Sequence, residues 1–316
     1  MRYCFFRNYC LPPFKRTAIR LNTIFPKTYE IFRFPAFVRF TVIQYLCKQK
    51  HTFLQNKHTM KKILLLTIAL AWLFSHNAYG WGNEGHDAVA YIAECNLNKK
   101  AKKTIEKYLG NHSIVYYASW MDYYRDTPPY KHTTVWHMAR VDKNLYYTDA
   151  VKSPKGDAVS ALEESIEMLK NYKNLDDSTV AVRLKYIIHI VGDMHCPVHV
   201  DYTGLNIWFN VKFFGKKTTY HALWDSRLIN EKHRWHYTEW QQQLDRCSKE
   251  EKAKIAAGTP REWFHETAVD CRYLYDIVKP DDELGPDYLN ANIELAEKQI
   301  LKAGYRLARV LNELFG

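Results

Sequence analysis

A histidine and an aspartate four positions apart lie in an otherwise apolar segment, residues 184–199, with the sequence LKYIIHIVGDMHCPVH. On a helix this spacing places His189 and Asp193 on one face, one turn apart. A buried histidine and a buried carboxylate must pair with each other or bind a metal, because an unpaired charge in a protein core is costly. A hydrogen-bonded core pair is the simpler interpretation of one such motif taken alone.

The same spacing recurs at His221 and Asp225, in the sequence YHALWDSRL. His199 follows the first pair, directly after a break at Cys196-Pro197. Imidazole nitrogen and carboxylate oxygen are both good zinc ligands, at about 2.0 to 2.2 Å. Two pairs and a further histidine therefore favour metal binding over two independent core pairs.

Two motifs upstream contain further residues of ligand type. The sequence ASWMDYYR contains Asp122 and Arg125, and VWHMARVD contains His137. Each is weak alone, because a single aspartate after a tryptophan usually caps a helix and a single histidine is usually a hydrogen-bonded core residue. A surface ion pair is the alternative role of Arg125.

Trp81 is placed to become the first residue of a processed chain. Residues 60–80 have the form of a secretory signal, with two early lysines, an apolar stretch over 63–74 and a small-residue cleavage site at 78–80. The apolar stretch spans about 18 Å as a helix, short of the roughly 30 Å hydrocarbon core of a membrane. After cleavage, the α-amino group and carbonyl oxygen of Trp81 can chelate a metal beside His86. The alternative role of Trp81 is that of an aromatic anchor near the chain terminus.

These residues together have the types and spacing of a metal cluster. Carboxylate-rich sites with room for water are usually catalytic, because structural zinc takes a closed set of cysteines and histidines. A non-catalytic exported zinc-binding protein is therefore the weaker interpretation. The sequence predicts a multi-zinc hydrolase with the ligands Trp81, His86, Asp122, His137, His189, Asp193, His199, His221 and Asp225.

The first 80 residues account for the basic charge of the chain. They contain 13 lysines and arginines and one acidic residue, which leaves 32 basic and 33 acidic residues in 81–316. The net charge of +11 is thus no argument for nucleic-acid binding by the rest of the chain. We interpret residues 1–59 as an extension from a start codon assigned too early, and a functional N-terminal arm is the alternative. Residues 81–316 are the predicted catalytic domain, exported to the periplasm or secreted, without a membrane anchor after processing.

Apolar residues recur at helical spacing through most of residues 81–316. Asp157 fits an N-cap before the periodic segment 158–169, and Thr259-Pro260 opens another helix. The only good strand candidate is the segment 207–214, so the sequence predicts an all-α domain.

The C-terminal segment 288–315 is predicted to be a long amphipathic helix. Its predicted outer face consists of Glu294, Lys298, Lys302 and Arg306.

Among the cysteines, Cys247 and Cys271 can close a disulfide in an exported protein, and free buried thiols are the alternative.

In combination, the motifs WGxxGH, ASWxDxxR, WH, HxxGDxHxPxH and HxxWD resemble those of the S1/P1 nuclease family, zinc-dependent single-strand-specific nucleases and 3′-nucleotidases. The resemblance runs from Trp81 to the chain end. It implies a phospholipase C/P1 nuclease-like helical fold with a cleft for three zinc ions. It also implies cleavage of single-stranded DNA or RNA to 5′-nucleotides, with 3′-nucleotidase activity left open and no stable protein partner.

The resemblance implies three ligand groups. The first zinc ion would be held by Asp122, His137, His189 and Asp193. The second would be held by the Trp81 amine and carbonyl, His86 and the bridging Asp193, and the third by His199, His221 and Asp225. Arg125 and Asp122 are the implied catalytic residues, with Arg125 neutralising charge on the phosphoryl oxygens.

The candidate substrate-binding residues depart from the family pattern. Where family members commonly carry an acidic base-recognition residue, this chain has Arg140, with Asp142 two positions later. The family's Gly-Gly-Asn stretch appears here as Gly204-Leu205-Asn206. We therefore take Arg140, Asp142 and Asn206 as substrate-binding candidates, with the base preference left open.

A zinc phospholipase C is the main alternative function. It uses the same kind of metal shell on a lipid phosphodiester and needs an exposed apolar rim. The tyrosines and tryptophan around the ASWxDxxR motif favour single-stranded nucleic acid instead, because unpaired bases stack on aromatic rings.

Overall fold

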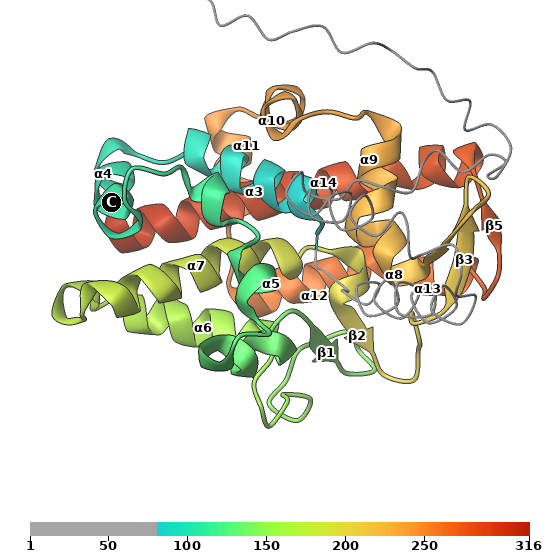
Figure 1. Ribbon diagram of the computed structural model, residues 1–316, viewed down its shortest axis with the longest axis horizontal. Coiled ribbons are helices and arrows are strands. Elements are labelled where there is room, and N and C mark those ends of the chain that lie inside the picture. Colours follow the sequence, from blue (N-terminus) through green and yellow to red (C-terminus); the bar gives the residue numbers. More distant parts are fainter. Residues whose placement is uncertain (1–80) are drawn as a thin grey trace, which may run out of the picture. The chain divides into compact units, whose positions relative to one another are not determined.

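The computed structural model describes residues 81–316, which form a helical domain (Figure 1). The predicted extension, residues 1–59, and the predicted signal peptide, residues 60–80, lie outside the described residues. None of the helices within residues 81–316 combines the length and the hydropathy that a membrane span needs. The all-α fold class predicted from the sequence is confirmed.

The elements of the N-terminal half are mostly helices and 3₁₀ turns. In chain order they are α3 (Asn83–Cys95), α4 (Lys99–Leu109), η2 (Ile114–Tyr117), α5 (Trp120–Tyr124), η3 (Pro128–Val135), β1 (Ala139–Val141), α6 (Ala158–Leu169), η4 (Tyr172–Asn174) and α7 (Asp177–Asp193). The predicted cap is confirmed, because the Asp157 carboxylate accepts a hydrogen bond from the Ser160 amide at the start of α6.

Short elements alternate with helices in the C-terminal half. They are η5 (Pro197–His199), β2 (Val200–Tyr202), β3 (Asn210–Phe213), β4 (Lys216–Thr219), α8 (Tyr220–Ala222), the π turn η6 (Leu223–Arg227), α9 (Leu228–Lys232), α10 (Tyr237–Leu244), α11 (Lys249–Ala256), α12 (Pro260–Cys271), α13 (Leu274–Ile277), β5 (Glu283–Leu284) and α14 (Pro286–Phe315). The helix predicted to open at Thr259-Pro260 is α12, with Thr259 as its cap.

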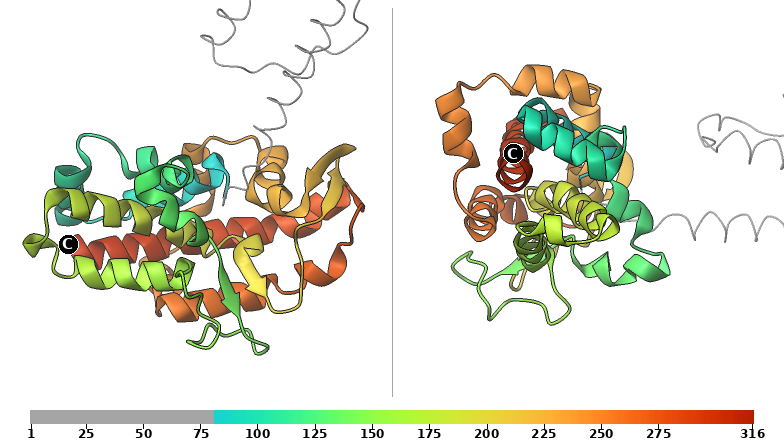
Figure 2. Two further views of the ribbon diagram at one scale, coloured as in Figure 1. Left: turned by 60° about the horizontal axis from the view of Figure 1, so that its bottom comes forward. Right: turned by 90° about the vertical axis from the view of Figure 1, so that its left-hand side faces the viewer.

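The 30-residue helix α14 is the central element of the packing. It contacts α3, α4, α7, α9, α11 and α12, and the right-hand view of Figure 2 shows these helices around it. The approach to α3 is close at Gly304, where a Cβ atom would lie 2.4 Å from Ile92 Cγ2. Helix α14 thereby fixes the positions of α7, which carries His189 and Asp193, and of α3, which carries His86.

The predicted outer face of α14 is partly wrong. Glu294 and Lys298 are exposed, whereas Lys302 and Arg306 are buried. The reason is that α11 and α12 cover this side of the helix, so its cations meet acidic side chains instead of water. Lys302 Nζ lies 2.6 Å from Glu266 Oε1, and Arg306 also pairs with Glu266.

The strand prediction covered only one of two small sheets. The hairpin β3–β4 falls at the predicted segment 207–214 and extends beyond it, and β5 adds a parallel strand to β3. Strands β1 and β2 pair in parallel and were not predicted, because three residues are too few to show an alternating pattern. Their register places Arg140 beside Asp201 and so joins the segments that follow His137 and His199.

The four cysteines among the described residues are free thiols. Cys196 and Cys271 are buried, Cys247 is half-buried and Cys95 is exposed. The disulfide between Cys247 and Cys271 is therefore not formed, and the alternative of free thiols holds in this structure.

Candidate metal centre

Helix α7 presents His189 and Asp193 on one face, and both side chains are fully buried. The His189 Nδ1 atom donates to the Ala118 carbonyl oxygen at 2.7 Å, because a carbonyl can only accept. This bond turns the other ring nitrogen, Nε2, towards Asp193 Oδ2 at 3.0 Å. Such a hydrogen bond to the distal nitrogen is how proteins orient metal-binding histidines.

Asp193 lies at the centre of a group of four histidines. Its Oδ2 atom lies 2.9 Å from His137 Nδ1 and 3.0 Å from His189 Nε2. Its Oδ1 atom lies 3.3 Å from His86 Nε2 and 3.2 Å from His199 Nδ1. The two oxygens of one carboxylate therefore face different histidines, which is the arrangement that a bridging ligand requires.

Asp122 joins the same group from α5. Its Oδ1 atom lies 3.7 Å from His137 Nδ1 and 3.9 Å from His189 Nε2. Arg125, three residues further along the chain, places Nη1 3.4 Å from the same oxygen. The structure thus brings a buried carboxylate and a guanidinium to one edge of the histidine group.

A second group forms around Asp225, on the π turn η6. Asp225 Oδ2 lies 3.1 Å from His221 Nε2, and Asp225 Oδ1 lies 3.5 Å from His199 Nε2. His199 has one ring nitrogen towards Asp193 and the other towards Asp225, so it connects the two groups. Cys196 donates to Asp225 Oδ1 at 3.4 Å.

The first residues of the domain lie beside the second group. Trp81 is fully buried, and the amide of Gly82 donates to the Asp225 carbonyl oxygen. His86, one turn into α3, stacks on His189 with ring centroids 4.1 Å apart. The close approach of α3 to α7 requires Gly192, where a Cβ atom would lie 2.8 Å from His86 Nδ1.

Many polar atoms of these residues are buried without a hydrogen-bond partner. Contacts such as His86 Nε2 to Asp193 Oδ1 are short, but they lack hydrogen-bond geometry. Buried polar atoms without a partner are rare because they cost free energy, and a metal ion would supply the missing partner. The atoms are His86 Nδ1 and Nε2, Asp122 Oδ1, His137 Nε2, Asp193 Oδ1, His199 Nδ1, His221 Nδ1 and Asp225 Oδ2.

The donor atoms are close enough to share metal ions. Three sets each have their donor atoms within 4.8 Å of one another. The first two sets share His189, and the third lies in the second group. The nitrogen and oxygen donors of these sets fit zinc. The sets are His86, Asp122 and His189; His137, His189 and Asp193; and Cys196, His199 and Asp225.

The carboxylates control the charge of the histidines. Burial lowers the pKa of His189, but Asp193 and Asp122 outweigh it and raise the pKa to about 9. Burial also lowers the pKa of His199, but Asp193 and Asp225 outweigh burial and raise this pKa to about 10. His86 and His137 have pKa values below the ordinary value, mainly because of burial. The buried carboxylates therefore create a site that attracts cations, either protons or metal ions.

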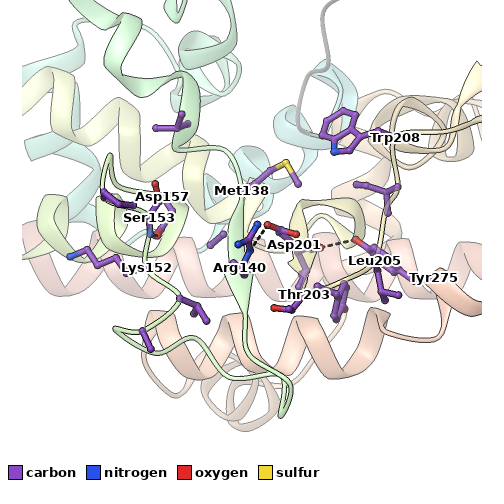
Figure 3. A pocket seen from close by; sticks show the side chains of 18 residues that line it. Met138, Arg140, Lys152, Ser153, Asp157, Asp201, Thr203, Leu205, Trp208 and Tyr275 are labelled. Atoms are coloured by element: carbon purple, nitrogen blue, oxygen red, sulfur yellow. Dashed lines mark hydrogen bonds and ion pairs between the residues drawn. The ribbon is translucent and has the colours of Figure 1, made fainter.

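A cavity of about 920 Å³ is lined by residues of β1 and β2 and by Trp208 (Figure 3). Arg140 and Asp201 lie side by side in it, with Arg140 Nε donating to Asp201 Oδ2 at 2.7 Å. Trp208 lines the same cavity, is 53% exposed and stacks on His221 with ring centroids 4.3 Å apart. A cation, a carboxylate and an exposed aromatic ring thus surround a cavity that adjoins the candidate metal ligands.

The other two substrate-binding candidates have structural contacts. Asp142 Oδ1 accepts hydrogen bonds from the Asn144 and Tyr146 amides and so closes a turn. Asn206 Oδ1 accepts from the Trp208 amide at 2.8 Å and so helps to fix the segment that carries this ring. Of the three candidates, Arg140 is the one that lines the cavity.

Sequence reasoning missed three residues at this centre. Cys196 lies inside a ligand motif, but next to Pro197 the sequence indicates only a chain break there. Trp208 lies two residues after Asn206, and Asp201 lies two residues after His199. This proximity in the chain is the only signal that the sequence offers for them. Stacking on His221 and pairing with Arg140 join elements far apart in the chain, so they depend on the fold.

Comparison with known proteins identifies the class of enzyme. The family model for S1/P1 nuclease matches residues 81–316. Endonuclease 4 of Arabidopsis thaliana is 24% identical over 295 residues, which cover 80% of this chain and 94% of that protein. Nuclease S1 of Aspergillus oryzae is 30% identical over 176 residues, or 52% of this chain and 58% of that protein. Nuclease P1 of Penicillium citrinum is 26% identical over 268 residues, or 75% and 98%.

The chain therefore belongs to the S1/P1 nuclease family. It is a hydrolase that acts on phosphodiester bonds of nucleic acid, and the helical fold agrees with this class. The resemblance drawn from the sequence motifs is confirmed over the whole of the described domain.

Proposed function

We propose that this enzyme is a zinc-dependent nuclease that cleaves single-stranded DNA or RNA to 5′-nucleotides and uses three zinc ions. One observation carries the proposal: Asp193 faces four histidines with both of its oxygens, in a buried group in which several donor atoms lack hydrogen-bond partners. Such a group attracts cations, because buried carboxylates are costly unless positive charge compensates them.

The nine predicted ligands form three overlapping groups in this proposal. The contacts of Asp122 with His137 and His189 support the first, and the stacking of His86 on His189 places the second beside it. The pairing of Asp225 with His199 and His221 supports the third. The position of Trp81, next to the bond between Gly82 and Asp225, supports a role for its free amine after processing.

Zinc bound here would supply Lewis-acid stabilisation of phosphate oxygens and would lower the pKa of water from 15.7 to about 7. The residues around it contribute charge and position. Arg125 neutralises negative charge on the phosphoryl oxygens, and Asp122 holds this guanidinium at 3.4 Å. The buried side chains exclude bulk water, so these electrostatic interactions are stronger than they would be in water.

The cavity beside the second group would hold a nucleoside of the substrate. Trp208 offers an exposed ring for stacking, which is worth about 1 to 3 kcal/mol per base and depends little on sequence. Arg140 and Asp201 offer a hydrogen-bond donor and acceptor at the cavity wall. Asp142 and Asn206 would act indirectly. Asp142 would fix the turn that follows Arg140, and Asn206 would fix the segment that carries Trp208.

The proposal includes export of the enzyme. Cleavage before Trp81 would remove residues 60–80 together with anything translated before them, and would create the terminal amine. The processed enzyme would begin where the family match begins.

The test is release of soluble nucleotides from single-stranded DNA and RNA by the zinc-loaded enzyme that begins at Trp81. We expect release from both polymers, slower release from duplex DNA, and loss of release after treatment with a chelator. A phosphatidylcholine substrate tests the alternative function. Lipid cleavage without nucleotide release would contradict the proposal and would identify a phospholipase C.

A further inference from the structure

Cys196 belongs to the second group of donors, although neither its motif nor the family resemblance assigns it a role. Its Sγ atom donates to Asp225 Oδ1 at 3.4 Å. The sulfur, a ring nitrogen of His199 and a carboxylate oxygen of Asp225 all lie within 4.8 Å of one another. Cys196 is fully buried, and His199 and Asp225 are each 2% exposed. The sulfur therefore lies where a metal ion held by His199 and Asp225 would be found.

The neighbouring atoms give independent support for a cation at this place. His221 Nδ1 and Asp225 Oδ2 are buried and have no hydrogen-bond partner. A thiol alone satisfies little of this demand, because S–H is a weak donor with one hydrogen. A cation next to the sulfur would supply the partner that the thiol alone does not.

We propose that Cys196 binds a metal ion as a thiolate, together with His199 and Asp225. The inference rests on the proposed metal-dependent function and adds sulfur to a donor set otherwise made of nitrogen and oxygen. His221, whose Nε2 atom lies 3.1 Å from Asp225 Oδ2, completes four protein donors.

Binding exchanges a proton for the metal. The S–H bond of Cys196 breaks, the proton passes to the buffer, and a sulfur–metal bond forms, so no oxidation or reduction takes place. Without metal, burial raises the pKa of the Cys196 thiol well above its usual range, and Asp225 raises it further. The thiol is then neutral and donates to Asp225. A coordinated thiol is deprotonated outright, because the ion's charge outweighs these effects.

The sulfur ligand would change the metal preference of this group. Thiolate is a soft ligand that favours zinc and similar ions, whereas magnesium, calcium and manganese prefer oxygen. We expect cadmium to compete with zinc here and magnesium to fail. At the groups around Asp193, which have only nitrogen and oxygen donors, cadmium should compete less well.

The chain contains a matched control for Cys196. Cys271 is also a fully buried free thiol, and burial raises its pKa well above the usual range as well. It lies on α12, next to Gln299 and outside the histidine groups. A Cys271→Ser variant therefore changes a buried sulfur without changing a proposed ligand.

The experiment is X-ray absorption at the zinc edge of the zinc-loaded enzyme, with cobalt substitution as a second readout. Zinc–sulfur bonds lie at about 2.3 Å, clearly longer than zinc–nitrogen bonds at about 2.0 to 2.1 Å. We expect a sulfur shell, and in the cobalt enzyme a near-ultraviolet sulfur-to-cobalt charge-transfer band. Cys196→Ser should remove both signals, and Cys271→Ser should retain both.

Each outcome decides one proposal. Bound zinc or cobalt without a sulfur shell and without the band would overturn the role of Cys196 and leave the proposed function intact. Signals that persist in Cys196→Ser would also overturn it. No bound metal in the wild-type enzyme would contradict the proposed function itself. If Cys196→Ser fails to fold, the wild-type sulfur shell and the Cys271→Ser spectrum still decide the question.

Discussion

Asp193 Oδ1 lies 3.3 Å from His86 Nε2, and this contact joins the end of α7 to the first turn of α3. The same carboxylate contacts His137 and His189 through its other oxygen. His189 and His199 lower the pKa of Asp193 well below its usual range, against the effect of burial, so the carboxylate is ionised. The charge and position of this one side chain therefore determine whether the two proposed ions around it can bind together.

Asp193→Asn is expected to be the most damaging single change among the proposed ligands. The amide keeps the shape of the side chain but loses the negative charge and one acceptor. Activity should fall about 100-fold or more, with metal content reduced by more than one ion per chain. Metal analysis and nuclease assays on the same preparation check this. The control is Asp276→Asn, which changes an exposed aspartate that pairs with Arg272. Wild-type activity in Asp193→Asn would refute the bridging role.

Gly192→Ala is expected to displace His86. The added Cβ atom would lie 2.8 Å from His86 Nδ1, which is closer than side chains tolerate. Because the displaced ring belongs to the metal centre, affinity for one ion should fall about 10- to 100-fold, as for other changes that misplace ligands. Gly285→Ala, which meets open space, is the control. Equal metal affinity in the two variants would show that α3 and α7 can separate without cost.

Trp208→Leu is expected to raise the KM for single-stranded DNA about tenfold, because stacking of a base is worth about 1 to 3 kcal/mol. The value of kcat should change little, since the metal ligands are retained. Trp208→Phe keeps an aromatic ring and should stay within a few-fold of wild type. If leucine and phenylalanine raise KM equally, the ring does not act by stacking.

The metal-free enzyme is expected to lose stability as the pH rises from about 7 to 10. The pKa values of His189 and His199 are raised to about 9 and about 10, so the folded state holds protons that the unfolded state has released. Their contribution is complete below the ordinary value of 6.5 and disappears as the pH passes the raised values. The pKa values of His86 and His137 are lowered, so the protonation of these two histidines changes the stability only below pH 6.5, outside this range.

Thermal unfolding of the chelated enzyme across this pH range measures the effect. His199→Gln should flatten the dependence, because one of the two protons is then absent. Zinc should reverse the dependence, since metal binding requires neutral histidines and becomes stronger as the pH rises. A melting temperature of the metal-free enzyme that is constant from pH 7 to 10 would contradict the raised pKa values.

One residue added before Trp81 is expected to reduce the zinc content by one ion per chain and to remove most activity. The terminal amine becomes a peptide nitrogen, which no longer has a free lone pair for the metal. One residue added after Gly316, which is exposed, is the control. Zinc content unchanged by the N-terminal addition would show that the amine is not a ligand.

The sequence by itself determined the helical class and most of the donor residues. Helical periodicity and four-residue spacing are local properties, so pairs such as His189 with Asp193 and His221 with Asp225 were visible without a structure. The cap at Asp157 was visible for the same reason. The motif combination was specific enough to identify the family before any distance was known.

Only the tertiary structure decided which residues meet. It placed His86 against Asp193, over a hundred positions away, and Trp208 on His221. It buried Lys302 and Arg306, which helical periodicity assigned to the outer face, because other helices cover that side of α14. It also placed Cys196 beside Asp225. The physical reason is that spacing fixes a side chain's direction on its own helix, whereas contacts between distant segments depend on how the helices pack.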